Sequence, residues 1–237
     1  MYKDFDDISQ YYDLMYVNQD SYAEEVSQIK MIVDLYKKSS GMQLLDIACG
    51  TGGHAMYLKE NYNVTGIDLS RAMLDIAREK ISDVKFIEAD MFNFNLGIKY
   101  DVILNLYGSI CFAESYNQLI DGISCASMHL KEGGVYILTP WSTVDTFKPG
   151  IVSKSKNFGD VSYSRMESIQ LAADGRIEVD MHHLIGKDNH INYFHHALNL
   201  SQFREEEYLL AIKESGLKLI QRLNETDFRM GAFICTK

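Results

Sequence analysis

A glycine-rich turn after an apolar stretch constrains this chain more than any other feature. Residues 44–53 read LLDIACGTGG, and Asp68 closes the next apolar run at 64–68. An apolar strand, a glycine turn, a helix and a second strand that ends in an acid form the layout of a nucleoside-cofactor site in a doubly wound α/β domain. Asp46 stands four residues before Gly50, where a carboxylate would repel a pyrophosphate and attract a cofactor that carries positive charge.

The composition is that of an ordinary globular protein. The chain has 237 residues, of which 46% are hydrophobic and 24% are charged, so we expect a single domain over 1–237 that can carry an insertion. A net charge of −10 argues against nonspecific binding of nucleic acid, which rests on Lys and Arg. The first residues lack the basic start and apolar core of a signal peptide, and no apolar run approaches a membrane span of ~20 residues. We therefore expect a cytoplasmic protein without a membrane segment.

The four cysteines show no metal-binding or redox spacing. They are Cys49, Cys111, Cys125 and Cys235, and no two form a CxxC pair. We expect reduced, buried thiols, as is usual in the cytosol.

Apolar periodicity divides most of the chain into alternating helices and strands. The predicted helices are 20–38, 52–60, 70–80, 114–129 and 204–215; the predicted strands are 42–48, 62–68, 83–88, 99–106, 133–139, 217–223 and 229–236. Such alternation predicts an α/β fold with a doubly wound, mainly parallel sheet of seven strands.

The pattern changes between 150 and 200. Residues 161–169 and 176–181 alternate in period two, and 190–195 do so less regularly, with turn sequences at 172–175 and 186–189. This pattern predicts an inserted antiparallel sheet with one face toward solvent. It is too large for an idle loop, so we expect it to cap a substrate pocket or to form a dimer contact.

The motifs together resemble those of class I S-adenosylmethionine-dependent methyltransferases. Motif I of that class is an acid followed by G-x-G, here Asp46, Gly50 and Gly52. Its later landmarks correspond to Asp68 and to residues 89–91, 100–103 and 130–134, so that the resemblance covers residues 42–139. It implies the seven-stranded fold of that class and the cofactor S-adenosyl-L-methionine.

The resemblance also implies roles at the cofactor. Asp46 would face the cationic amino group, Asp68 would accept hydrogen bonds from the ribose hydroxyls, and Asp90 would accept one from the adenine amine. Gly50 and Gly52 would let the backbone approach the ligand closely. The full expected cofactor set is Asp46, Ala48, Gly50, Thr51, Gly52, Asp68, Leu69, Met73, Asp90, Met91, Phe92 and Leu106.

A nicotinamide-dependent dehydrogenase is the alternative for the core. Gly50, Gly52 and Ala55 fit a relaxed dinucleotide fingerprint. Asp46 is poorly placed for a pyrophosphate, however, and no Lys-Tyr or Arg-His pairing for hydride transfer stands out downstream. The methyltransferase interpretation also explains Asp90.

Beyond the core, the whole chain resembles nucleotide-sugar N-methyltransferases. The resemblance rests on residues 12–16, 107–110 and 139–141 and on Arg229 near the end. It implies that the enzyme transfers a methyl group by in-line displacement to a small-molecule amine such as a nucleotide-linked aminosugar. The chain departs from that family in two places: residues 139–142 read TPWS where the family has Glu-Pro-Trp-Trp, and Phe112 stands where it has His or Tyr.

Candidate acceptor residues follow from the same resemblance. Tyr12 is the candidate catalytic residue that lines the methyl-transfer point; the candidate substrate residues are Tyr16, Tyr107, Ser109, Trp141 and Arg229. Each tyrosine can instead be a core or lid residue, and Arg229 can be a solvated ion-pair partner. An O-methyltransferase acting on another small molecule, and a nonenzymatic module that senses the cofactor, remain alternatives.

Five histidines cluster in the inserted region. They are His182, His183, His190, His195 and His196. Adjacent residues on a strand point to opposite faces, and a tight zinc site needs three or four converging ligands, so we expect no metal.

Overall fold

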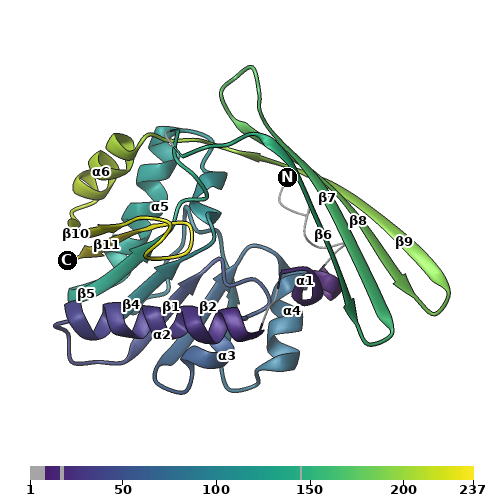
Figure 1. The fold of residues 1–237 in the computed structure, drawn as a ribbon. Coiled ribbons are helices and arrows are strands. Elements are labelled where there is room, and N and C mark those ends of the chain that lie inside the picture. Colours follow the sequence, from purple (N-terminus) through teal and green to yellow (C-terminus); the bar gives the residue numbers. More distant parts are fainter. Residues whose placement is uncertain (1–8, 17–18, 145) are drawn as a thin grey trace.

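A seven-stranded sheet lies at the centre of the computed structural model, which describes residues 9–16, 19–144 and 146–237, without the side chains of Leu14, Tyr16 and 19–21. Its order is β10-β11-β5-β4-β1-β2-β3 (Figure 1). The strands are β1 (Gln43–Ile47), β2 (Asn63–Asp68), β3 (Lys85–Glu88), β4 (Tyr100–Asn105), β5 (Leu130–Leu138), β10 (Lys218–Leu223) and β11 (Ala232–Thr236). Strands β1 to β5 pair in parallel, whereas β11 is antiparallel to both β5 and β10. The predicted doubly wound, mainly parallel sheet is confirmed.

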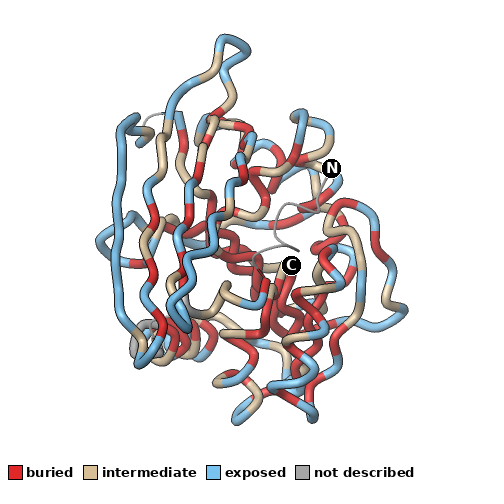
Figure 2. The backbone as a smooth tube through the Cα atoms, turned by 90° about the vertical axis from the view of Figure 1, so that its right-hand side faces the viewer, coloured by how far each residue is buried: buried red, intermediate tan, exposed pale blue. Residues whose placement is uncertain are grey.

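Helices cover both faces of this sheet. They are α1 (Ser9–Tyr16), α2 (Gln19–Tyr36), α3 (Ala55–Leu58), α4 (Arg71–Lys80), α5 (Tyr116–His129) and α6 (Glu205–Glu214), with a short 3₁₀ helix, η1 (Ser109–Phe112). Alternate residues of the strands enter two separate apolar clusters: Leu45 packs in the cluster that contains α5 and α6, and Leu44 packs in the one that contains α2 and α4. Figure 2 shows the buried backbone gathered in this central layer. Burial on both faces explains why the strands read as continuous apolar runs.

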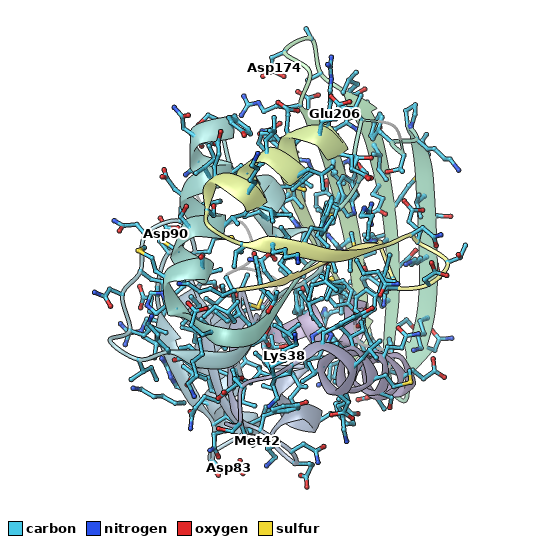
Figure 3. The ribbon with its side chains drawn as sticks, turned by 90° about the vertical axis from the view of Figure 1, so that its left-hand side faces the viewer. Lys38, Met42, Asp83, Asp90, Asp174 and Glu206 are labelled. Carbon is cyan, nitrogen blue, oxygen red and sulfur yellow. The ribbon has the colours of Figure 1, made fainter. Side chains whose placement is uncertain are left out.

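The parallel strands share one direction, which places their carboxyl ends at a common edge. Met42 and Asp83, just before β1 and β3, are both at the bottom of Figure 3, and Asp90, just after β3, lies higher. Loops that follow β1, β2, β3 and β4 therefore meet at one edge, which is the usual place for a ligand in such a sheet.

The predicted insertion is a four-stranded antiparallel sheet that stands beside the central sheet (Figure 1). Its strands are β6 (Gly150–Phe158), β7 (Val161–Leu171), β8 (Ile177–Lys187) and β9 (His190–Leu200). Asp188 and Asn189 both have positive φ in the two-residue β8–β9 turn, as a type I′ turn requires. Buried residues alternate along β8, so the sheet has an inner face toward the central sheet and an outer face toward solvent.

Two elements of the structure were not predicted from the sequence, because their residues carry no clear apolar period. β6 was not predicted: it is an edge strand whose residues are nearly all exposed. Nor was α1. The helix predicted over 52–60 is shorter, because a turn occupies 51–54 and α3 spans only Ala55–Leu58. The other predicted elements are present with ends moved by a few residues, and β8 and β9 run longer than predicted.

All four cysteines are buried and unpaired, as the sequence predicts. Among the described residues, no helix combines the length and the apolar character that a membrane span requires.

Candidate active site

A cavity of ≈ 400 Å³ opens at the carboxyl edge of the central sheet and extends to the inner face of the insertion. Most of the predicted site residues line it: Tyr12, Asp46, Ala48, Gly50, Thr51, Asp68, Leu69, Met73, Asp90, Met91, Phe92, Leu106, Tyr107, Ser109, Trp141 and Arg229. Gly52 is the one predicted site residue with a described position that does not line the cavity. The side chain of Tyr16 lies outside the described residues. The structure thus brings together residues that the sequence spreads over more than two hundred positions.

Asp46 is the most unusual group in the cavity. Its side chain is 2% exposed at the end of β1, and its Oδ2 has no hydrogen-bond partner among the described residues. Burial raises the pKa of this carboxyl from 3.8 to about 6; His54 lowers it and Asp68 raises it further. A buried, unpaired acceptor is costly for a folded chain, so a cationic hydrogen-bond donor fits here.

Asp68 holds the glycine turn in place. Its Oδ2 accepts a hydrogen bond from the backbone N–H of Gly50 at 2.8 Å, and its Oδ1 accepts one from the N–H of Ser70 at 2.9 Å. Gly50 and Gly52 have φ of 53° and 78°, which glycine adopts without strain, whereas Ala48, with φ of 58°, has a backbone conformation that residues with a Cβ rarely adopt. Asp68 therefore shapes the turn besides lining the cavity.

Gly52 serves the packing of the protein rather than the cavity. A Cβ at this position would lie 3.1 Å from Ile81 Cδ1 and from Phe86 Cζ, both side chains of the core. A Cβ at Gly50, in contrast, would meet a single atom of the described residues, Tyr12 Cε1, at 3.9 Å. The expectation of close backbone approach therefore fits Gly50, and the structure does not bring Gly52 to the cavity.

The residues expected around the adenine lie together. The Oδ1 of Asp90 accepts a hydrogen bond from the N–H of Phe92 at 2.9 Å, which fixes the turn after β3. The amide of Asn105 donates to the sulfur of Met91 at 3.7 Å. Leu69, 40% exposed, completes an apolar wall with Met91 and Phe92.

A buried polar network that the sequence did not predict lies beside Asp46. Nε2 of His54 lies 2.9 Å from Oε2 of Glu25, and both residues are 6% exposed. The hydroxyl of Tyr107 donates to the same Glu25 oxygen at 2.6 Å and accepts from Nη1 of Arg229 at 3.1 Å. Burial raises the pKa of Glu25, but hydrogen bonds from His54 and Tyr107 outweigh it and keep that pKa below its ordinary value. The one sequence feature that could have indicated this network is Glu25, a charged residue on the apolar face of the predicted helix 20–38.

Helix α1 is tied to the glycine turn through Asp13. Thr51 Oγ1 donates to Asp13 Oδ1, and Lys80 Nζ donates to Asp13 Oδ2, each at 2.5 Å. These contacts join α1 to α4 and to the turn, and they set Tyr12 at the cavity. The hydroxyl of Thr51, expected at the cofactor, is thus engaged with Asp13.

Trp141 and Gly108 pack against each other at the edge of the cavity. A Cβ on Gly108, whose φ is 73°, would come within 2.4 Å of Trp141 Cβ and 2.7 Å of its backbone. Ser109 donates from Oγ to the carbonyl of Leu106 at 3.1 Å, so its hydroxyl is engaged within the loop. Phe112, at the position where the resemblance implies His or Tyr, also lines the cavity.

The inner face of the insertion adds charged residues that the sequence analysis did not select. Lys154, Arg165 and Glu167 line the cavity from β6 and β7, and Nη2 of Arg165 lies 3.3 Å from Oε1 of Glu167. Arg165 is 5% exposed. Apolar residues of β8 and β9 continue this wall: Val179, Met181, Leu198 and Leu200. The register of four long strands decides which residues face the cavity, and sequence periodicity alone did not fix it.

Comparison with known proteins gives matches over the core and over nearly the whole chain. The family described as "Methyltransferase domain" matches residues 44–134. A dTDP-3-amino-3,4,6-trideoxy-alpha-D-glucopyranose N,N-dimethyltransferase of Streptomyces venezuelae is 28% identical over 211 residues, covering 88% of this chain and 89% of the relative. A dTDP-4-amino-2,3,4,6-tetradeoxy-D-glucose N,N-dimethyltransferase of Saccharopolyspora spinosa is 30% identical over 204 residues, covering 83% and 79%. The crystal structure of Streptomyces venezuelae DesVI superposes with a TM-score of 0.89 at 25% identity, covering 95% of this chain and 96% of that one.

The fold and the site define a class I S-adenosylmethionine-dependent methyltransferase. Within this class the chain belongs to the family of the sugar N-methyltransferases. The dehydrogenase alternative is set aside, since neither the family match nor these relatives are dehydrogenases. The residues fit the cofactor: the unpartnered Oδ2 of Asp46 suits the cationic amino group, and the open space at Gly50 suits close approach.

Proposed function

We propose that this enzyme methylates the amine of a dTDP-linked aminosugar, in two rounds, as the names of its relatives state for theirs. One observation carries the proposal: the cavity that contains Asp46 also contains Lys154 and Arg165 from the inserted sheet. With Arg229, three cationic side chains line this cavity, although the chain has a net charge of −10 and Glu167 pairs with Arg165. Guanidinium and ammonium groups are suited to bind phosphate oxygens.

The cavity divides into two parts. The loops after β1, β2 and β3 would hold S-adenosylmethionine, with Asp46 at its amino group, Asp68 at its ribose and Asp90 at its adenine. The bound cofactor supplies an electrophilic methyl group. The inner face of the insertion would hold the acceptor, its diphosphate toward Lys154 and Arg165.

The protein accelerates transfer chiefly by positioning the two reactants and by excluding water, which can contribute up to ~7–11 kcal/mol for well-aligned groups. We assign Tyr12 to the methyl-transfer point, because α1 is fixed to the glycine turn through Asp13. Tyr107, Ser109, Trp141 and Arg229 stay proposed acceptor contacts.

The test is a transfer assay with labelled S-adenosylmethionine and three acceptors: a dTDP-3-amino sugar, a dTDP-4-amino sugar and the same aminosugar without its nucleotide. We expect a dimethylated product from at least one dTDP-linked acceptor and little product from the free sugar. Methylation of free sugar and dTDP-sugar with equal kcat/KM would contradict the proposal.

Arg165→Ala and Lys154→Ala test the acceptor side alone. Loss of a charge-assisted contact of ~1.5–3 kcal/mol predicts a roughly 10- to 100-fold higher KM for the dTDP-sugar. The Kd of S-adenosylmethionine should stay within a factor of about two. Lys187→Ala, an exposed change at the end of β8, is the matched control and should behave as wild type. An unchanged KM in both cavity variants would remove the diphosphate assignment.

We also propose that two copies associate through the outer face of the insertion. Its exposed apolar residues are Ile151, Met166, Leu184, Ile191 and Tyr193, each 46–75% exposed. Light scattering should give twice the chain mass for wild type and the single mass for Leu184→Glu; a monomeric wild type at micromolar concentration would refute it.

Four unpaired buried cysteines support the expected cytoplasmic location.

A further inference from the structure

We propose that Asp180, His182 and His195 form a binding site for a divalent transition-metal ion of the zinc type on the outer face of the inserted sheet. One ligand atom from each residue lies within 4.8 Å of the others. The trio is remote from the methyl-transfer chemistry, because it faces away from the cavity that the inner face of the sheet lines.

The register of the insertion creates this cluster. Asp180 and His182 are two residues apart on β8 and therefore share one face, and His195 lies directly opposite His182 on β9. Cross-strand neighbours on one face are within reach of a common ligand. The members of each pair of adjacent histidines do face opposite ways, as the sequence predicts. One histidine of each pair nevertheless meets a carboxylate across two strands, and no local pattern predicts this.

The distances suit an ion after small side-chain rotations. Nε2 of His182 lies 3.4 Å from Oδ2 of Asp180, and Nε2 of His195 lies 2.5 Å from its Oδ1. Two ligands of a tetrahedral zinc ion with bonds of about 2.0–2.1 Å lie about 3.3 Å apart. The Asp180 and His195 side chains are 47% exposed, so their hydrogen bond is weak and can be exchanged for metal bonds.

A second observation points to a ligand site. Nδ1 of His182 is hydrogen-bonded to the hydroxyl of Tyr193 at 2.7 Å, which leaves Nε2 directed at Asp180. Metal-bound histidines commonly donate their other ring N–H to such a partner, which fixes the tautomer and the ring orientation. Two imidazoles and one carboxylate form a donor set that zinc binds in proteins, with a fourth position open to water.

All three ligands come from one chain, so the expected stoichiometry is one ion per chain. Met181, between two of the ligands, lines the active-site cavity from the opposite face of β8. An ion that joins β8 to β9 would therefore stiffen the wall against which the acceptor is proposed to lie.

Calorimetric titration of untagged, chelator-treated protein with Zn²⁺ tests the site. We expect one site per chain in wild type, and at least a 10-fold weaker affinity in His182→Ala and His195→Ala. Tyr193→Phe, which keeps all three ligands, should weaken binding by roughly 10-fold. The matched control is His190→Ala, since His190 is an exposed histidine of β9 outside the trio and should not matter.

Cobalt provides an independent readout. Co²⁺ should give the visible absorption of a tetrahedral ion in wild type and in His190→Ala, and lose it in His182→Ala. The proposal is overturned if wild type shows no one-site isotherm, or if the ligand variants bind Zn²⁺ as tightly as wild type does. Circular dichroism confirms that the exposed substitutions leave the fold intact.

Discussion

At the scale of single residues, Asp46 combines a cost to stability with a function in binding. Burial raises the pKa of its carboxyl to about 6. Because the folded pKa exceeds the ordinary 3.8, the stability that this group contributes is complete below pH 3.8 and is lost as the pH rises through about 6. Above pH 6 the chain therefore carries an ionised, buried group that S-adenosylmethionine is expected to neutralise.

Asp46→Asn should thus raise stability and abolish binding at the same time. At pH 8 and without ligand, we expect a free energy of unfolding higher by up to about 3 kcal/mol, from a pKa difference of roughly two units. At pH 4 the difference should nearly vanish. Denaturant unfolding at the two pH values and calorimetry with S-adenosylmethionine check both parts. A less stable variant at pH 8 with unchanged cofactor affinity would contradict this role.

His54, unlike Asp46, is a buried polar group with a buried partner: it is hydrogen-bonded to Glu25. Among the described side chains, His54→Ala would leave Glu25 with the hydroxyl of Tyr107 as its hydrogen-bond donor, and removing one partner of a buried pair costs about 3–5 kcal/mol. Glu25→Gln, which keeps a hydrogen-bonding side chain without the charge, should cost less. Denaturant unfolding at pH 7 measures both variants. Equal stability of His54→Ala and wild type would show that the pair is not coupled.

At the scale of elements, the turn at Gly108 positions the loop after β4 against Trp141. Gly108→Ala must adopt a positive φ and place its Cβ 2.4 Å from Trp141 Cβ, so we expect a loss of about 2–4 kcal/mol and lower activity. Gly159→Ala is the control: its φ is also positive, at 59°, but a Cβ there meets open space. That variant should lose only about 1–2 kcal/mol, from backbone strain. Thermal unfolding compares the two, and equal losses would mean that the contact with Trp141 is unimportant.

The parallel core was predictable from sequence, because burial on both faces gives its strands continuous apolar runs and the motif spacing places Asp46, Asp68 and Asp90 at strand ends. The edge strand β6 was not predictable in this way, since an exposed strand with Lys154 and Lys156 has no apolar period. The inner-face residues Arg165 and Glu167 were not predicted as site residues for a related reason. A charged residue on a half-buried strand is expected to face solvent unless the register of the strand is known. The pairing of Glu25 with His54 joins residues far apart in the sequence, and no local pattern encodes it.

At the scale of the whole molecule, the insertion belongs to the same apolar core as the central sheet. Ile177, Val179, Met181 and Leu200 are at most 5% exposed and pack in the cluster that contains α5 and α6. Replacing residues 150–200 by a short glycine linker should therefore lower the midpoint of thermal unfolding and expose apolar surface to a hydrophobic dye. Cooperative unfolding at the wild-type temperature would show instead that the insertion is an independent appendage.

We propose that one cavity holds the methyl donor at Asp46 and the amine at the inserted sheet. A crystal structure with S-adenosylhomocysteine would show where the donor binds. The amino nitrogen of the ligand should lie within about 2.7–3.2 Å of Asp46 Oδ2, with its ribose at Asp68 and its sulfur facing the insertion. Density for the ligand elsewhere, or with its amino group turned away from Asp46, would contradict the assignment.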